Sequence, residues 1–343
     1  MPHQVTLKPS GRSYSVADGD TVLAAGLAAG CNLPYSCRAG MCRTCRGRVV
    51  EGSVDYGDVE ERFLTAGQRA QGLAMLCRAR PLTDLVVEVE ELKLQGARPR
   101  MLPCRVTAIS RPAPDVAILT LKLPMNEPLQ FVAGQYIDFL LEDGKRRSYS
   151  IANAPQIKGT ATLELHIRHM PGGLFTDQVF TRMKERDVLR IEAPLGTFYL
   201  REESAKPVIF LASGTGFAPI KSIIEFMLAG NSGRAMTLYW GCRALQDLYL
   251  PELPQQWARA HPGLRFVPVF SEPRVEDAWS GRCGLVHRAV MADFPDLSAH
   301  QVYACGAPVM VEAARTDFVA QCRLPEAEFF ADAFLTEADH ARA

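Results

Sequence analysis

Four cysteines near the start of the chain have the spacing of metal ligands. Cys37, Cys42 and Cys45 fall within nine positions, and Cys77 lies far downstream. Two irons that share two sulfides need four thiolates, and a tight loop can supply three of them while a distant segment supplies the fourth. A four-cysteine zinc site usually contains two Cys-x2-Cys pairs, and this set contains one. The spacing therefore favours a [2Fe–2S] cluster over zinc.

The residues around these cysteines also affect what the loop can do. Ala39 and Gly40 are small, so backbone N–H groups can approach the sulfides and tune the potential. Four arginines and no acid lie in or beside the loop: Arg38, Arg43, Arg46 and Arg48. They form either a solvated rim or a basic face that docks an acidic partner, and the sequence leaves both readings open.

A second group of motifs surrounds the string Arg147-Ser148-Tyr149-Ser150, which ends a strand-like run. Alone this string is a weak signal, because an exposed strand end with a packed tyrosine has the same residues. Three glycine-containing strings accompany it, at 134–136, 172–176 and 194–198.

A third motif, Gly-Thr-Gly-Phe-Ala-Pro at 214–219, follows a continuous apolar run and opens a helical pattern. Such a loop after a buried strand is similar to a dinucleotide-binding fingerprint. Pro219 takes the place of the third glycine, and proline suits the first turn of a helix. Two further strings occur at strand ends, Tyr-Trp-Gly-Cys-Arg at 239–243 and Cys-Gly-Ala-Pro at 305–308.

The elements that must position these motifs fall into three regions. Residues 1–93 mix short strands with one helix at 22–29, and residues 94–101, with Gly, Pro and charge, form a linker. Residues 102–202 contain short strands of the kind that build a small antiparallel barrel. In residues 203–343, buried apolar runs alternate with helical patterns, which predicts a parallel α/β sheet.

Length and composition agree with this division. A chain of 343 residues predicts two or three domains, and 48% hydrophobic with 22% charged residues is typical of a globular protein. Lys+Arg and Asp+Glu are both 38, so the basic excess of a nucleic-acid binder is missing. Because no apolar run approaches about 20 residues and the N-terminus lacks a secretory signal, we expect a cytoplasmic enzyme.

The cysteine loop resembles that of plant-type ferredoxin domains. The resemblance covers residues 34–47 and implies a β-grasp-like α+β domain in which Cys37, Cys42, Cys45 and Cys77 hold a [2Fe–2S] cluster. That family often reads Cys-Gly-x-Cys, whereas this chain has Arg43-Thr44 between the last two loop cysteines. The departure is expected to alter the surroundings of the cluster.

The second and third motif groups resemble the ferredoxin–NADP reductase superfamily, which implies an FAD-binding barrel. By that resemblance Tyr149 stacks on the flavin ring, Ser150 bonds near its reactive edge and Arg147 holds the pyrophosphate. This suits a cofactor that needs an aromatic face, a guanidinium and helix amides. The remaining flavin-site assignments are Gly172, Gly173 and Thr176, which open a helix onto the phosphates, and His166. His166 and His169 are expected on opposite faces of a strand.

The same resemblance assigns the coenzyme site. The loop residues Gly214, Thr215, Gly216 and Pro219 cradle the nucleotide pyrophosphate, and Cys305 with Gly306 lies beside the nicotinamide. An aromatic residue near the C-terminus, Phe334, covers the flavin. Ser150, Cys305 and Phe334 are thus the expected catalytic residues.

The choice of coenzyme depends on two residues. Glu272 stands where relatives that use NADP tend to carry a basic residue, and its charge would repel a 2′-phosphate. Arg243 argues mildly for NADPH. We therefore expect NADH.

The order ferredoxin, flavin barrel, nucleotide domain is similar to that of reductases of bacterial multicomponent oxygenases, above all those that serve Rieske aromatic-ring dioxygenases. It is equally similar to CDP-6-deoxy-glucoseen reductases, which serve a deoxysugar dehydrase, and a di-iron monooxygenase is a further possible acceptor. A hydride delivers two electrons and the cluster accepts one, so the flavin converts between them. The resemblance implies a monomeric NADH-dependent reductase whose partner is a terminal oxygenase. A redox sensor and a free-standing ferric or flavin reductase stay open as alternatives.

Overall fold

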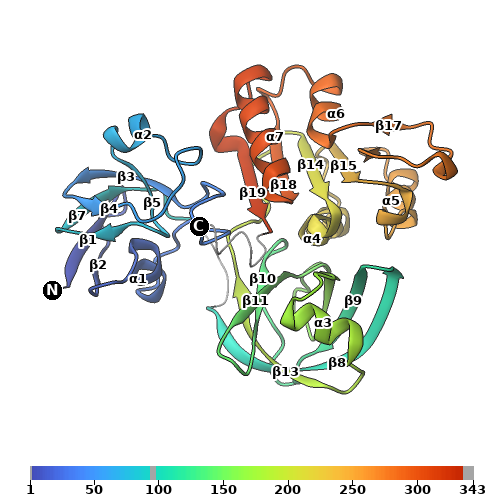
Figure 1. Ribbon diagram of the computed structural model, residues 1–343, viewed down its shortest axis with the longest axis horizontal. Helices are drawn as coiled ribbons and strands as arrows, with labels where there is room; N and C mark the ends of the chain where they lie inside the picture. The colour runs from blue at the N-terminus through green and yellow to red at the C-terminus, as the bar shows by residue number, and fades with distance from the viewer. Residues whose placement is uncertain (1, 93–97, 335–343) are drawn as a thin grey trace. The chain divides into compact units, whose positions relative to one another are not determined.

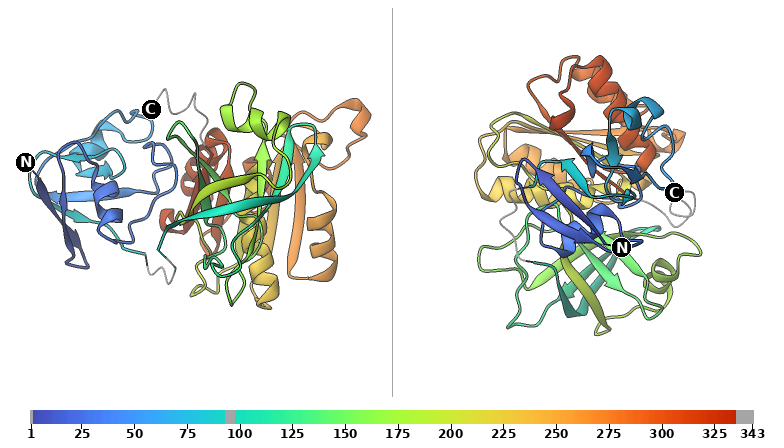
Figure 2. Two further views of the ribbon diagram at one scale, coloured as in Figure 1. Left: turned by 90° about the horizontal axis from the view of Figure 1, so that it is seen from below. Right: turned by 90° about the vertical axis from the view of Figure 1, so that its left-hand side faces the viewer.

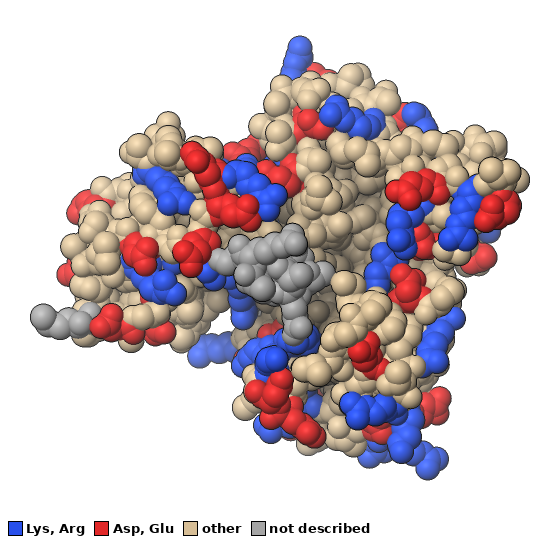
Figure 3. All heavy atoms as spheres, in the orientation of Figure 1, with Lys and Arg blue, Asp and Glu red and all other residues tan. Residues whose placement is uncertain are grey.

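The computed structural model describes residues 2–92 and 98–334 (Figure 1). The described residues form two compact units, 2–92 with 331–334, and 98–330. No helix among them is both long and apolar enough to cross a membrane. Basic and acidic side chains are interspersed over the face drawn in Figure 3, as the balanced composition predicts.

The first unit is built on a five-stranded sheet with the strand order β2-β1-β7-β3-β5. β1 pairs with β7 in parallel and with β2 antiparallel, and Val5 and Leu7 on one face of β1 are fully buried. Helix α1 begins after Thr21, whose hydroxyl accepts a hydrogen bond from the Ala24 amide (3.2 Å). The elements are β1 (His3–Lys8), β2 (Ser13–Val16), α1 (Val22–Ala28), β3 (Arg46–Glu51), β4 (Val54–Asp55), α2 (Ala66–Ala70), β5 (Leu73–Met75), β6 (Arg80–Pro81) and β7 (Leu85–Glu88).

The second unit begins with an antiparallel barrel whose strand order is β11-β10-β13-β8-β9-β12. An isolated antiparallel bridge between Ile151 and Leu165 links the two edges of this sheet. The barrel contains β8 (Arg100–Ala113), β9 (Val116–Lys122), β10 (Tyr136–Leu140), β11 (Arg146–Ser150), β12 (Thr162–Arg168), α3 (Leu174–Thr181) and β13 (Val188–Leu195).

Strand β12 shows the two faces of the barrel most clearly. Leu163, Leu165 and Ile167 are fully buried in the barrel core. The alternate positions Glu164, His166 and Arg168 carry polar side chains and lie on the opposite face, because side chains alternate along a strand. The polar face contacts the nucleotide-binding part of the same unit.

The rest of the second unit is a six-stranded sheet with the order β17-β16-β15-β14-β18-β19. Helices α4 and α5 lie on one face of this sheet and α6 and α7 on the other (Figures 1 and 2). The elements are β14 (Val208–Ser213), the 3₁₀ turn η1 (Gly214–Gly216), α4 (Phe217–Ala229), β15 (Met236–Cys242), α5 (Glu252–Ala260), β16 (Leu264–Phe270), β17 (Arg282–Cys283), α6 (Val286–Asp293), β18 (Gln301–Gly306), α7 (Pro308–Gln321) and β19 (Phe329–Ala333).

The chain order of this sheet creates a switch point. From β14 the chain moves outward through β15 and β16, and it then returns to β18 on the other side of β14. Ligands of open α/β sheets bind at the carboxyl ends of the strands where the order reverses. The loop after β14 and the end of β18 therefore mark the expected coenzyme site.

The predicted linker needs a correction. The segment 94–101 lies partly outside the described residues, and β8 already begins at Arg100. Arg100 pairs with Ala193 of β13, so the end of the predicted linker is a strand of the barrel. Local composition missed this strand because its pairing partner lies far along the chain.

Candidate functional site

The loop between α1 and β3 supplies Cys37, Cys42 and Cys45, and the segment after β5 brings Cys77 beside Cys45. Cys42, Cys45 and Cys77 are at most 7% exposed, and Cys37 is half-buried. The backbone amides of Ala39 and Cys42 each donate to the Cys37 sulfur at 3.4 Å. Backbone amides of this loop thus donate to a cysteine sulfur, as the small residues Ala39 and Gly40 led us to expect.

The four thiols lie in two hydrogen-bonded pairs, Cys37 with Cys42 and Cys45 with Cys77. The hydrogen bond from Cys37 lowers the pKa of Cys42 to about 5, so this thiol gives up its proton readily when metal binds. Within residues 2–92 and 98–334, no three or more His, Cys, Asp or Glu side chains converge as ligands of one metal ion. Two thiol pairs fit two irons, each of which takes two thiolates beside the bridging sulfides.

The unusual Arg43 occupies a strained backbone position. Its φ is +60°, in the left-handed region that glycine adopts without cost. Its guanidinium donates to the Arg62 carbonyl (2.6 Å). Arg43 thus adopts a backbone conformation that favours glycine, and its side chain makes a hydrogen bond that a glycine could not make.

Strand β11 carries the predicted flavin residues. Tyr149 is half-buried, and its ring packs against Phe139 and Phe175 at centroid distances of 5.8 and 5.5 Å. Burial raises the pKa of Tyr149, so its hydroxyl stays protonated. Ser150 ends the strand opposite Tyr136 and is 5% exposed. A tyrosine ring that packs on two phenylalanine rings at the end of a strand could lie against a flavin ring. The roles of Arg147, Tyr149 and Ser150 stay predictions.

The turn before α3 uses some of the predicted phosphate-binding groups for itself. The Thr176 hydroxyl donates to the Met170 carbonyl (2.9 Å), and the Gly172 amide donates to Asp177 (3.1 Å). Gly173 is the N-cap of α3. Gly172 and Thr176 therefore shape the turn, and the first-turn amides of α3, which lack intrahelical partners, are the groups that could meet a phosphate.

The coenzyme loop η1 lies at the switch point of the parallel sheet. A Cβ at Gly216 would lie 2.2 Å from the carbonyl oxygen of Cys305, so only glycine fits there. The Trp240 indole N–H donates to the Gly214 carbonyl (3.0 Å). Thr215 lies in the same turn and is 9% exposed, and Pro219 lies in the first turn of α4. Glycine backbone followed by a helix N-terminus is suited to a pyrophosphate.

Cys305 and Gly306 end β18, directly beside this loop. The Cys305 side chain has no exposed surface. Its place beside the nicotinamide therefore stays a prediction. Phe334 follows β19 and is half-buried, and its predicted role over the flavin is likewise untested.

Arg243 and Glu272 meet at the carboxyl edge of the sheet, after β15 and β16. The Glu272 amide donates to the Arg243 carbonyl (2.8 Å). The Arg243 guanidinium is paired with Asp247 (3.3 Å), and no ion pair of Glu272 occurs within the described part of the chain. The arginine that favours NADPH is thus paired with an acid, whereas the acid that disfavours a 2′-phosphate has no basic partner among the described residues.

His166, a predicted cofactor-binding residue, lies buried between protein groups, and its cofactor role stays a prediction. Its side chain has no exposed surface, and its two ring nitrogens lie 2.7 Å from the Tyr249 hydroxyl and 2.8 Å from Glu164. His166 therefore contacts protein groups with both nitrogens. His169 points the other way, toward Asp177 and Phe180, as expected from strand alternation.

Arg168 and Lys221 are functional candidates that sequence reasoning missed. A Cβ built on Gly214 would lie 2.8 Å from an Arg168 Nη atom, so this guanidinium from the barrel reaches the coenzyme loop. Lys221 of α4 pairs with Glu164 of the barrel (3.2 Å). The alternation Glu-Leu-His-Ile-Arg along β12 was the available signal, because it marks a strand with one polar and buried face.

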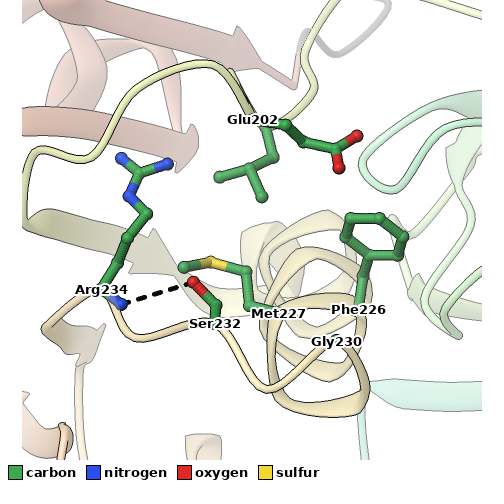
Figure 4. Close-up of a pocket in the computed structure, with 7 residues that line it drawn as sticks. Glu202, Phe226, Met227, Gly230, Ser232 and Arg234 are labelled. Carbon is green, nitrogen blue, oxygen red and sulfur yellow. Dashed lines mark hydrogen bonds between the residues drawn. The ribbon is translucent and has the colours of Figure 1, made fainter.

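A hollow of about 150 Å³ lies at the opposite edge of the sheet (Figure 4). Arg234, which lines it, precedes β15, and its backbone amide donates to the Ser232 hydroxyl (3.4 Å). Because coenzymes bind at the carboxyl ends of parallel strands, this hollow at an amino end is not the coenzyme site.

Comparisons with known proteins agree with these three regions. Residues 5–82 match the 2Fe-2S iron-sulfur cluster binding domain family, residues 103–199 the oxidoreductase FAD-binding domain family, and residues 210–316 the oxidoreductase NAD-binding domain family. These matches confirm the predicted fold class and the cofactors FAD, [2Fe–2S] and NAD(H).

Three known proteins are similar to this chain over nearly its whole length. The chain is 40% identical over 336 residues to the CDP-6-deoxy-L-threo-D-glycero-4-hexulose-3-dehydrase reductase of Yersinia pseudotuberculosis, covering 98% of this chain and 99% of the relative. It is 35% identical over 341 residues to reductase component 2 of the terephthalate 1,2-dioxygenase of Comamonas, covering 98% of each. The crystal structure of the Amycolatopsis cytochrome P450 reductase GcoB is similar with a TM-score of 0.77 and 35% identity, covering 97% of this chain and 98% of that one.

The three matched domains and these relatives agree with the geometry of the site. This chain therefore belongs to the family of NADH-dependent flavin and iron–sulfur reductases, which includes reductase components of oxygenases and of a hexulose dehydrase.

Proposed function

We propose that this protein is the reductase component of a ring-hydroxylating oxygenase system and that its electron acceptor is a Rieske-type terminal oxygenase. The observation that carries the proposal is the 35% identity, over 98% of this chain and 98% of the relative, to reductase component 2 of a terephthalate 1,2-dioxygenase. The reductase acts as a monomer in the cytoplasm.

In this proposal each region has one task. The barrel holds FAD, with Tyr149 against the ring and Arg147 at the pyrophosphate. The loop at 214–216 holds the NADH pyrophosphate, with Cys305 beside the nicotinamide and Phe334 over the flavin. When bound, FAD supplies the conversion from a two-electron hydride donor to a one-electron acceptor. The four thiols hold the cluster from which electrons leave the protein.

A second acceptor is supported by one observation. The identity of 40% to a hexulose dehydrase reductase exceeds the 35% to the terephthalate reductase, at the same coverage of this chain. Docking residues of the ferredoxin domain need not follow overall identity, because few residues dominate an interface. A dehydrase is therefore the competing acceptor.

The test is anaerobic reconstitution. The purified protein should release FAD on denaturation and contain about two irons per chain, and NADH should bleach the flavin and cluster absorbance. NADH oxidation is then measured with the oxygenase component of a terephthalate 1,2-dioxygenase, with a hexulose dehydrase, and with soluble ferric iron. Fastest coupled turnover with the oxygenase supports the proposal.

Faster NADH oxidation with the dehydrase than with the oxygenase would identify the dehydrase as the acceptor. A rate with ferric iron far above the rates with both proteins would indicate a free-standing reductase. Cluster absorbance that NADH leaves unchanged would indicate a redox sensor. Zinc in place of iron would contradict the electron-transfer function itself.

A further inference from the structure

Two buried side chains and one half-buried carboxylate connect the flavin barrel to the coenzyme-binding part of the same unit. Glu164 and His166 come from β12 of the barrel, and Tyr249 follows β15. His166 Nδ1 lies 2.7 Å from the Tyr249 hydroxyl, and Nε2 lies 2.8 Å from Glu164. We call Glu164, His166 and Tyr249 the His166 chain.

The charges around the His166 chain give each hydrogen bond one direction. Burial opposes ionisation of Glu164, but the hydrogen bond from His166 and the charge of Lys221 lower the pKa of Glu164 to about 2. An ionised carboxylate only accepts hydrogen bonds, so His166 Nε2 carries the proton. Desolvation lowers the pKa of His166, so the ring is neutral, and Nδ1 accepts from the Tyr249 hydroxyl.

Lys221 anchors the barrel end of the chain. Its ammonium lies 3.2 Å from Glu164, 2.8 Å from Glu225 and 3.2 Å from the Ala152 carbonyl, and its side chain is 6% exposed. Three acceptors thus meet the three donors of the ammonium. Glu164 is therefore held from both sides, by Lys221 and by His166.

The other end of the chain reaches the coenzyme loop. The Tyr249 ring packs edge-on against Trp240 at 5.1 Å, and Phe217 stacks on Trp240 at 3.9 Å. The Trp240 indole N–H donates to the Gly214 carbonyl (3.0 Å), and Phe217 directly follows Gly216. Both ends of the glycine turn thus rest on the aromatic residues that Tyr249 contacts.

We infer that the His166 chain positions the loop at 214–216 relative to the flavin barrel and so sets the distance across which the hydride passes. The coenzyme is held by one side of this interface and the flavin by the other. Reacting atoms must approach to about 3–3.5 Å, and a displacement of about 1 Å costs roughly 100-fold in rate. Glu164, His166 and Tyr249 are thus positioning residues, and the inference rests on the NADH-to-flavin half of the proposed function and not on the acceptor.

Tyr249→Phe tests the inference, because it removes one hydroxyl and keeps the ring. Flavin reduction by NADH is followed by anaerobic stopped flow, and amide hydrogen exchange at 214–217 is measured on the holoenzyme without NADH. We expect the limiting reduction rate to fall about tenfold, the NADH dissociation constant to stay within twofold, and exchange at 214–217 to become faster.

Ser222→Ala is the matched control. Ser222 is fully buried in α4 and its hydroxyl donates to the Asn153 carbonyl of the barrel region (2.8 Å), but it is not one of the groups that lead to the glycine loop. We expect its reduction rate to stay within twofold of the unsubstituted protein.

Two further variants serve as a rescue test. His166→Gln keeps one acceptor and one donor, whereas His166→Leu keeps neither. We expect the glutamine variant to retain several-fold more of the reduction rate at equal FAD content.

The inference is overturned if Tyr249→Phe reduces flavin within twofold of the unsubstituted protein, if exchange at 214–217 is unchanged, if Ser222→Ala loses as much rate, or if Gln and Leu at 166 lose equally. The inference is also overturned if the loss of reduction rate in these variants is proportional to their loss of FAD. If the unsubstituted protein, loaded with FAD, is not reduced by NADH, the proposed function fails instead, which distinguishes the two.

Discussion

At the scale of single residues, we predict that coenzyme choice depends on the neighbours Arg243 and Glu272. Asp247 pairs with Arg243, and Glu272 forms no ion pair within the described residues at the carboxyl edge of the sheet. A 2′-phosphate there would meet an acid at short range, and like charges disfavour binding.

We expect Glu272→Arg to narrow the preference for NADH over NADPH by about tenfold or more, because it replaces a repulsive charge with a bidentate phosphate ligand. The measurement is kcat/KM for each coenzyme. Glu276→Arg, a substitution at another exposed acid of the same loop, is the control for net charge. An equal change in both variants would contradict a specific role for Glu272.

Gly216 carries a second residue-scale prediction. An added Cβ would lie 2.2 Å from the Cys305 carbonyl oxygen, so the backbone of Gly216→Ala must shift. We expect flavin reduction by NADH to fall at least tenfold while FAD content is retained, as measured by stopped flow and by flavin extraction. Gly233→Ala has no atom within 4 Å of the added carbon and should leave the rate unchanged. Equal rates for the two variants would show that the close approach is unimportant.

At the scale of elements, β12 has two roles that its alternation separates. One face fills the barrel core with aliphatic side chains, and the other presents Glu164, His166 and Arg168 to the nucleotide-binding part. A strand that is buried on both faces, with charges on one of them, makes the stability of this unit sensitive to pH.

The pH dependence has a definite sign. The pKa of His166 is lowered in the folded state by desolvation, and that of Glu164 is lowered to about 2 from an ordinary 4.5. Both groups bind protons more readily when unfolded, so folding free energy is lost as pH falls. We expect the melting temperature of the flavin-containing unit to be flat between about pH 7 and pH 8, to fall below pH 6.5 as His166 protonates in the unfolded state, and to fall further below pH 4.5.

His287 and His300 have lowered pKa values for the same reason, so the variant His166→Gln isolates the contribution of His166. The difference in melting temperature between the unsubstituted and variant proteins should shrink as pH falls from 7 to 5. A difference that stays constant over this range would contradict a neutral buried His166.

At the scale of the whole molecule, the four cluster cysteines lie in the first compact unit, whereas the barrel and the loop at 214–216 lie in the second. Because each unit has its own core, a substitution in one unit should impair the cofactor of that unit alone. We expect Cys77→Ala to abolish the cluster absorbance and leave flavin reduction by NADH within twofold, because Cys77 pairs with Cys45 inside the first unit. Visible absorbance, iron content and stopped-flow flavin reduction measure both effects. Loss of both functions together would mean that the two units fold as one.

The sequence by itself indicated the [2Fe–2S] cluster and the coenzyme loop, because most of their residues lie in short strings, and resemblance to a known superfamily supplied the flavin. Cys37, Cys42 and Cys45 lie in one loop, and Gly214 and Gly216 lie in one turn, so their chemistry can be read without the fold. The fold class of the barrel followed from short strands separated by turns and that of the parallel sheet from continuous apolar runs, whereas the β-grasp domain was implied by the ferredoxin resemblance. Only the tertiary structure decided which thiols pair, that β8 begins inside the expected linker, and that His166 contacts Tyr249 and Glu164. These depend on pairings between residues far apart in the chain, such as Arg100 with Ala193 and His166 with Tyr249, and burial is a property of the packed molecule that no local pattern contains.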